Sequence, residues 1–206
     1  MEWMREMDEI KASALKELAN IGISHVATAL GEISREKVDI SLPELEPYAK
    51  DRILEYINQE AGVAAAYLTV EGIAQLTETL ILFPKQEIYE LMDRFVNVDA
   101  ESIIDTLSLS LPEQESIFAE ISTIIAATYF SAVDSMFNLK IQYGVPRVRL
   151  GREGLGDFID HVLQQNEGMC VKVSFSSQKS NFKGSFLLLP DPATVNRFFQ
   201  AIGLAC

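Results

Sequence analysis

The sequence carries one polar pattern twice, with the copies 103 residues apart, and this repeat limits the folds open to the chain more than any other feature. Each copy has a serine, a glutamate and an amide or hydroxyl residue at positions i, i+4 and i+7, and a proline 23 residues after the last of them. On a helix, these three polar positions lie along one face. The residues are Ser13, Glu17, Asn20 and Pro43 in the first copy and Ser116, Glu120, Thr123 and Pro146 in the second.

The polar row has two interpretations. Any amphipathic helix has a solvated face, and a single row of this kind is typical of one. A solvated face does not need the same residue types at the same spacings twice, so the repetition favours two copies of one functional site. Aliphatic and aromatic positions such as Leu15 and Val26, or Phe118 and Ile125, lie on a different face of each helix and are predicted to enter the core.

Hydrophobic periodicity predicts the same order of elements in both halves of the chain. Each half is expected to have a long helix, a strand before the proline, a hairpin and a closing helix. Residues 44–59 are predicted to be an irregular acidic segment with a short helix at about 52–58, and 99–108 a helical insertion. The predicted elements are helices at 7–32, 86–95, 113–137, 155–164 and 193–202, and strands at 38–42, 63–71, 76–83, 139–144, 147–150, 170–176 and 182–189.

The two halves are predicted to form one domain. The strand ends Leu80–Pro84 and Phe186–Pro190 are similar and lie 106 residues apart, which extends the repeat beyond the helices. Because three strands cannot cover both faces of a sheet, the halves should join into a single six-stranded sheet with the two long helices packed on it. The sequence therefore predicts an α/β (α+β) fold: one pseudo-twofold duplicated domain over residues 1–206, with repeats at about 7–98 and 110–206.

Composition excludes several classes of function. The 206 residues carry a net charge of −13, so the surface should repel nucleic acid, which needs clustered Lys and Arg. No run approaches the roughly 18 apolar residues of a membrane span and the start lacks a signal-peptide pattern, so a cytoplasmic protein is expected. Cys170, Cys206, His25 and His161 have no metal-ligand spacing, and no metal or cofactor is expected on this chain. Instead, Cys170 is predicted to be buried in a strand and His25 to be partly buried in the first helix.

At these residues the sequence resembles the CheC phosphatase family, which includes CheX and the phosphatase part of FliY. The family signature is Asp or Ser, three residues, Glu, two residues, Asn, then twenty-two residues and Pro. Ser13, Glu17, Asn20 and Pro43 satisfy every term. Around them, residues 18–22, 27–30 and 37–43 are also similar to the family.

The resemblance implies dephosphorylation of a phosphorylated CheY-like response regulator in chemotaxis, whose phosphoaspartate lies beside a Mg²⁺ ion in the regulator. It also implies that Asn20 would orient the attacking water and that Glu17 would pair with a lysine of the regulator. An amide can donate and accept a hydrogen bond, so these residue types suit catalysis by positioning. Ser13 and Pro43 are expected to support the site. A CheD-like deamidase is a further partner that the resemblance allows.

The second copy departs from the family pattern at Thr123. Its side chain is shorter than that of asparagine and branched at Cβ, so its reach and its rotamers are more restricted. Glu120 and Thr123, supported by Ser116 and Pro146, are expected to form either a weak or slow second site or a surface inherited from duplication. For the whole chain, the alternative to a phosphatase is a non-catalytic module that sequesters the phosphorylated regulator or docks a CheD-like deamidase.

Overall fold

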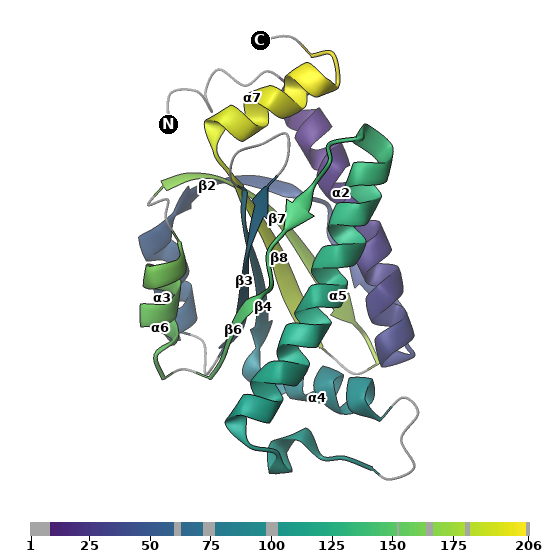
Figure 1. The fold of residues 1–206 in the computed structure, drawn as a ribbon, viewed down its shortest axis with the longest axis vertical. Helices are drawn as coiled ribbons and strands as arrows, with labels where there is room; N and C mark the ends of the chain where they lie inside the picture. Colours follow the sequence, from purple (N-terminus) through teal and green to yellow (C-terminus); the bar gives the residue numbers. More distant parts are fainter. Residues whose placement is uncertain are drawn as a thin grey trace.

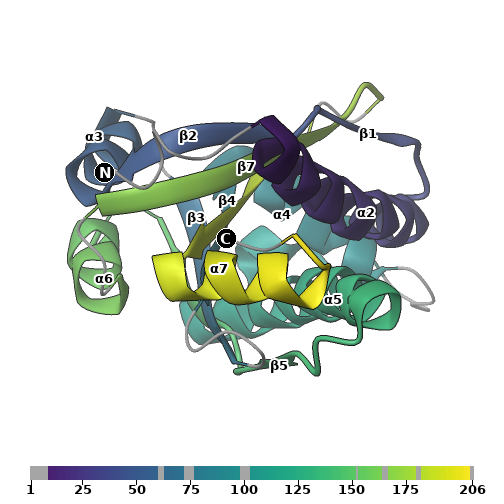
Figure 2. The ribbon, with the colours of Figure 1, turned by 90° about the horizontal axis from the view of Figure 1, so that it is seen from above.

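A curved antiparallel sheet forms the centre of the molecule, with two long helices on one face and two short helices on the other (Figure 1). This computed structural model describes residues 9–59, 63–71, 77–97, 103–151, 153–163, 167–179 and 182–204. Figure 2, seen from above, shows the long helices α2 and α5 on one side of the strands and the short helices α3 and α6 on the other. The predicted mixed fold is confirmed.

The sheet has eight strands at six positions across its width, here called ranks, because each edge position holds two short strands in line. Its order is β1-β7-β8-β4-β3-β5, with β2 continuing the rank of β1 along β7, and β6 continuing the rank of β5 along β3. The six-stranded prediction therefore holds for the ranks, but each edge rank is broken into two strands. The strands are β1 Val38–Ile40, β2 Glu44–Ala49, β3 Val63–Glu71, β4 Thr77–Pro84, β5 Gln142–Tyr143, β6 Arg147–Leu150, β7 Glu167–Ser177 and β8 Lys183–Pro190.

Each half of the chain supplies an edge to the other half. The strands β1 and β2 from the first half pair with β7, while β5 and β6 from the second half pair with β3. The hairpins β3–β4 and β7–β8 join through β4 and β8 at the centre. Because a half on its own would leave these inner strands without partners, the two halves complete one sheet between them.

The repeated prolines lie at the breaks in the two edge ranks. Pro43 lies between β1 and β2, Pro146 lies between β5 and β6, and both are buried. Proline has no backbone N–H, so it fits where a ladder is interrupted at a sheet edge. The fixed spacing from each polar row to its proline therefore has a structural reason in the fold.

The long helices are α2 (Glu9–Ser34) and α5 (Leu111–Phe137), which pack side by side and run antiparallel. A Cβ added at Gly22 of α2 would lie 2.4 Å from the ring of Tyr129 in α5, so this close approach requires glycine. A shift of 103 residues superposes the buried positions of the two helices. The matched pairs are Leu15 with Phe118, Ala19 with Ser122, Gly22 with Ile125, Ile23 with Ala126, Val26 with Tyr129 and Leu30 with Val133.

By length and composition α5 could cross a membrane, since its most apolar window has a mean hydropathy of 1.5. The fold gives another reason for this composition. Phe118, Ile121 and Ile125 of α5 are fully buried between α2 and the sheet. A core helix passes the same test, so α5 is weak evidence for a membrane span.

The match between the two hairpins needs a correction of one residue. Phe83 and Leu189, which a shift of 106 would equate, lie in different core clusters on opposite faces of the sheet. Successive strand residues alternate between faces, so equivalent positions must differ by an odd number. A shift of 105 pairs Phe83 with Leu188, and both contact the cluster beneath the long helices.

Three other predictions differ from the structure. The segment predicted to be irregular begins with strand β2, whose Pro47 is tolerated because β2 is an edge strand. The predicted insertion contains one 3₁₀ turn, η1 (Thr106–Ser108), after extended residues 103–105; residues 99–102 lie outside the described part. Asn97 makes side-chain hydrogen bonds to both backbone groups of Ile104, and these tie Ile104 to the end of α4. The strand predicted at 139–144 is reduced to β5.

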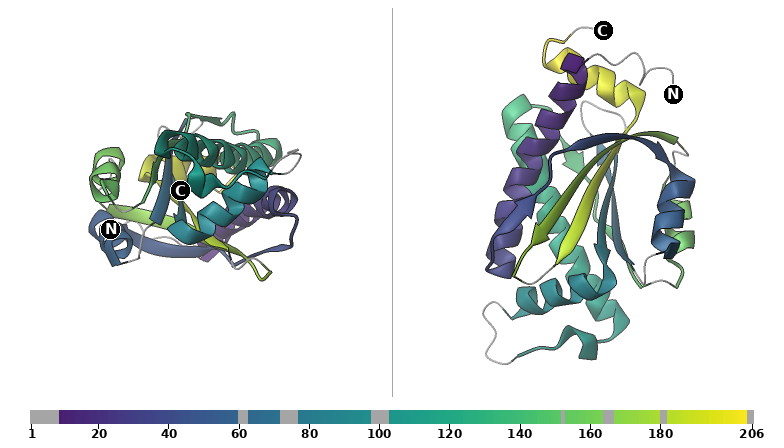
Figure 3. Two further views of the ribbon diagram at one scale, coloured as in Figure 1. Left: turned by 90° about the horizontal axis from the view of Figure 1, so that it is seen from below. Right: turned by 180° about the vertical axis from the view of Figure 1, so that it is seen from behind.

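Of the remaining helices, α3 and α6 cover the outer face of the sheet, whereas α4 and α7 lie at the two ends of the long-helix layer, as two further views show (Figure 3). On the outer face, Lys50 Nζ of α3 donates to the carbonyl oxygens of Asp160 and Leu163, at 2.6 and 3.0 Å, and ties α3 to α6. Residues such as Leu155 and Ile159 of α6 pack there against Tyr67 of β3. The bounds are α3 Lys50–Gln59, α4 Lys85–Val96, α6 Leu155–Val162 and α7 Pro192–Ala201.

Candidate functional site

The first polar row lies on the outward side of α2, away from the buried seam. Ser13 and Glu17 are exposed and Asn20 is half-buried. Ser24 continues the row, and its hydroxyl donates to the backbone oxygen of Asn20 at 2.7 Å. Within the described residues, the Asn20 carboxamide has no hydrogen-bond partner and Glu17 is in no ion pair, so both side chains are available to another molecule.

The second polar row lies on α5 in the same relation to its core face. Ser116 and Glu120 are exposed, and Thr123 is half-buried. The Thr123 hydroxyl donates to the backbone oxygen of Ala119, four residues earlier, at 2.8 Å. A hydroxyl has a single proton, so in this geometry Thr123 can accept a hydrogen bond from an outside group but cannot donate one.

The two rows lie on opposite sides of the contact between Gly22 and Tyr129. Because α2 and α5 run antiparallel, Asn20 and Thr123 are displaced from that contact in opposite directions. At a rise of 1.5 Å per residue, they are separated by about 12 Å along the helix axes. The structure therefore brings each row together within itself but does not merge the two rows into one site.

A shallow groove between the helices runs beside Asn20. From α2 it is lined by Asn20 and its neighbours, including the exposed side chain of His25. From α5 it is lined mainly by small side chains. The sequence expectation of a partly buried His25 is therefore wrong. Nothing in the first polar row indicates the α5 residues of the groove, although their own spacing puts them on one helix face. They are Ala127, Thr128, Ser131, Ala132 and Ser135.

The two prolines and Cys170, also singled out in the sequence, lie in or beside strands of the sheet and outside the groove next to Asn20. Pro43 and Pro146 lie at the breaks in the sheet edges described above. Cys170 is buried in β7, as predicted, and burial raises the pKa of its thiol to about 12. Among the residues that the structure describes, no group of three or more His, Cys, Asp or Glu side chains could hold a metal ion.

The fold and the paired helices define a class: α/β proteins with two long antiparallel helices on one face of a six-rank antiparallel sheet. Within that class, the chain is similar to the CheC-like family, whose model matches residues 10–46, the segment with the complete polar row and Pro43. A curated relative, CheY-P phosphatase CheC of Bacillus subtilis (strain 168), is 24% identical over 206 residues, or 95% of this chain and 95% of that protein. The recognition made from the motif is confirmed.

Solved structures support the fold over almost the whole chain. FliY of Thermotoga maritima superposes with a TM-score of 0.71 at 11% identity, covering 96% of this chain and 98% of the other. A chain of the FliM–SpeE complex from H. pylori gives a TM-score of 0.63 at 8% identity, with 96% of each chain covered. One fold can carry different functions, so these likenesses support the architecture and leave the activity to the site.

Proposed function

We propose that this protein is a phosphatase that hydrolyses the phosphoaspartate of a CheY-like response regulator in chemotaxis, in the cytoplasm. The observation that carries the proposal is the half-buried Asn20 carboxamide, which has no partner among the described residues and lies one turn from the exposed carboxylate of Glu17. The match to the CheC-like family over this segment, and the relative named CheY-P phosphatase, support it.

The proposed reaction is a hydrolysis assisted by positioning. The Asn20 carbonyl oxygen accepts a hydrogen bond from water and its NH₂ group donates one toward the phosphoryl group, which aligns the water with phosphorus. Water attacks, the bond between phosphorus and the aspartate oxygen breaks, and inorganic phosphate and a free carboxylate result. Glu17 docks the regulator by a charge-assisted hydrogen bond to a lysine. Phosphoryl transfer needs positioning more than covalent chemistry from the protein.

This scheme places no metal on the chain. The Mg²⁺ belongs to the partner regulator, where it would neutralise charge on the phosphoryl oxygens. The chain's part is to insert the α2 row so that Glu17 and Asn20 reach the phosphoryl group together. Their offset of three residues on a helix puts both side chains on one face, which suits a single insertion.

The second candidate function is binding without turnover, in which the same row sequesters the phosphorylated regulator or the chain docks a CheD-like deamidase. The observation that favours it is at the second row: Glu120 and Thr123 suit binding without turnover better than Glu17 and Asn20 do, because the Thr123 proton is already donated to Ala119.

The test measures phosphate release from a magnesium-loaded, phosphorylated CheY-type regulator, together with binding of that regulator. Asn20→Ala is expected to remove the acceleration and leave binding largely intact. Glu32→Ala, at an exposed position of α2 about three turns beyond Asn20 and outside the polar row, is the matched control and should retain both. Wild-type protein that binds the regulator without accelerating phosphate release would instead establish the second function.

A further inference from the structure

A second groove lies on the outer face of the sheet, opposite the face that carries α2 and α5. Its floor includes Leu82 and Leu187, which belong to the core cluster beneath α3 and α6 rather than the cluster beneath the long helices. Its wall includes Arg52 and Ile53 of α3. The groove therefore continues the layer that α3 and α6 begin over this face.

Cross-strand pairs between β7 and β8 arrange the polar side chains of the groove. Lys172 pairs with Leu187, Ser174 with Ser185, and Ser176 with Lys183, and all of them line the groove. The two lysines stand at opposite ends of a patch of serine hydroxyls, on different strands. This arrangement places cations on both flanks of an apolar and hydroxyl floor.

The groove is positively charged in a strongly acidic protein. Arg52, Lys172 and Lys183 line it and none of them is in an ion pair within the described ranges, whereas other cations of the chain, such as Arg94, are paired. Glu46 and Glu87 are the acidic lining residues. Glu87 already accepts a hydrogen bond from the backbone N–H of Lys183 at 2.6 Å, which stabilises its charge locally.

We infer that this groove docks an acidic amphipathic helix of a protein partner. The helix would present an apolar stripe to Leu82, Leu187 and Ile53 and place its carboxylates against Arg52, Lys172 and Lys183. Amphipathic helices cover the rest of this face, so a further helix beside α3 satisfies the same packing rule. Because the groove and the α2 row lie on opposite faces of the sheet, the docked helix and a regulator can bind at once.

The attraction to an acidic partner acts only at short range, inside the groove, because the protein as a whole is negatively charged. The net charge of −13 repels acidic molecules at long range, but screening limits that repulsion to about 8 Å at physiological salt. Within the groove, the unpaired guanidinium and ammonium groups form charge-assisted bonds with carboxylates. An acidic helix is therefore bound by the groove in preference to the rest of the surface.

The test uses the whole protein and a fluorescein-labelled peptide of sixteen residues, with leucine at i, i+3, i+4 and i+7 and glutamate at the remaining positions. Fluorescence anisotropy at physiological salt is expected to give saturable binding. A peptide with glutamine in place of glutamate keeps the leucine stripe but has no carboxylates, so it should bind much more weakly. Lys172→Glu and Lys183→Glu, together, should weaken binding by about tenfold or more, the change that loss of 1.4 kcal/mol brings.

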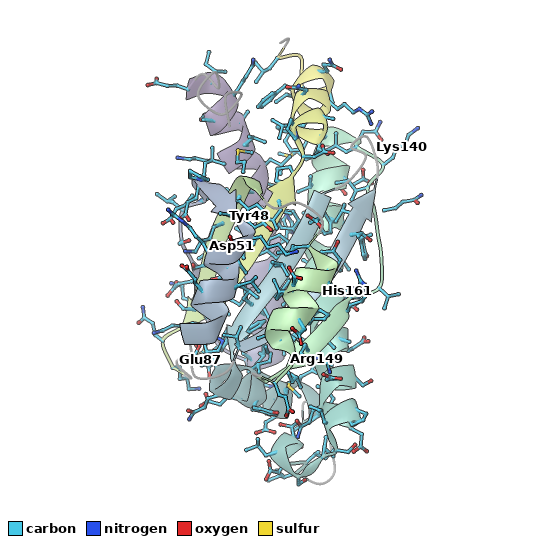
Figure 4. All side chains as sticks on the ribbon, turned by 90° about the vertical axis from the view of Figure 1, so that its left-hand side faces the viewer. Tyr48, Asp51, Glu87, Lys140, Arg149 and His161 are labelled. Atoms are coloured by element: carbon cyan, nitrogen blue, oxygen red, sulfur yellow. The ribbon has the colours of Figure 1, made fainter. Side chains whose placement is uncertain are left out.

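Lys140→Glu is the matched control, because Lys140 is exposed and lies far from Glu87 across the molecule (Figure 4). This variant should bind the acidic peptide as the wild type does. Equal weakening by Lys140→Glu would mean diffuse attraction and would overturn the proposal, as would no saturable binding. A concentration-dependent dimer lost in Lys183→Glu would assign the groove to a second copy of this chain and would also overturn it.

Discussion

The polar rows of α2 and α5 have the same spacing and the same relation to the core, yet they differ in the hydrogen bonds they can offer. At the first row, the Asn20 carboxamide has no partner within the described residues. At the second, Thr123 donates its only hydroxyl proton to Ala119. Six buried positions of α2 match buried positions of α5 at a shift of 103 residues, whereas the polar rows differ on the exposed face.

This contrast shows that two helices can share a buried seam and still present different hydrogen-bonding groups on their exposed faces. The buried face of α5 must be apolar at the same helical spacing as the buried face of α2, because both helices cover one continuous sheet. The outward residue has no such constraint, and a threonine there satisfies its hydroxyl within its own helix. The two sites are therefore expected to be unequal in catalysis.

The largest effect on phosphate release is expected when Asn20 of the first row is replaced by threonine, the residue that the second row has at Thr123. Asn20→Thr should lower phosphate release from the phosphorylated regulator by about a hundredfold or more, the usual loss when a positioned hydrogen-bond donor is removed. The introduced threonine would donate to the backbone oxygen of Lys16, as Thr123 does to Ala119. Single-turnover phosphate release measures it, and Asn20→Gln tests whether an amide that is displaced by one methylene is sufficient.

The next largest effect is on stability and comes from disturbing the contact between Gly22 of α2 and Tyr129 of α5. Gly22→Ala would place a methyl group 2.4 Å from the ring of Tyr129, so the helices must separate or the ring must move. Such overpacking should destabilise the protein by about 1–3 kcal/mol, seen as a lower denaturant midpoint. Gly156→Ala, in α6 with no atom within 4 Å of the added Cβ, is the control and should leave the midpoint unchanged or raise it slightly, because alanine favours a helix over glycine.

A smaller effect should follow from giving the second row the residue of the first. Thr123→Asn supplies an amide one turn from Glu120, so the chain would have two complete rows. When the phosphorylated regulator is in excess and fills every site, the rate of phosphate release per protein molecule should rise by about twofold, since one working site becomes two. An unchanged rate would mean that Thr123 is not what limits the second row. Ser122→Asn is unsuitable as a control because Ser122 is fully buried.

The smallest effect concerns the start of α5, where Ser110 and Glu113 form a capping box. Hydrogen bonds from the Ser110 side chain and backbone lower the pKa of Glu113. Its stabilising contribution is therefore present above the unfolded-state pKa and is lost as pH falls through the folded-state pKa. Glu113→Gln should show a weaker loss of thermal stability between neutral and acidic pH than the wild type, and equal losses in the two proteins would contradict the prediction.

Much of the fold could be predicted because it depends on local patterns. The seam residues of α2 and α5 repeat at helical spacing, and the strands of β3–β4 and β7–β8 are hydrophobic runs separated by turns. The exchange of edge strands between halves could not be read from the sequence, because pairing of β1 with β7 depends on residues more than 130 positions apart. Strand β2 was missed since Pro47 and its glutamates are typical of a loop.

The candidate site divides in the same way. Residue type and spacing select Glu17 and Asn20 as candidates, and the short, β-branched side chain of Thr123 gives a reason to expect a weaker second site. The hydrogen bond from Thr123 to Ala119 comes from the structure. The α5 side of the groove beside Asn20, with Ser131 and Ser135, depends on how two helices distant in sequence pack together. No local pattern contains that information.

The most direct test exchanges the two residues in one protein. The double variant Asn20→Thr and Thr123→Asn should recover phosphate release well above that of Asn20→Thr alone, because the amide now stands beside Glu120 on a helix with the same seam. Regulator binding should change little. If the double variant is as inactive as Asn20→Thr while binding persists, or if Asn20→Thr itself keeps the wild-type rate, the amide does not decide which row is catalytic and the account fails.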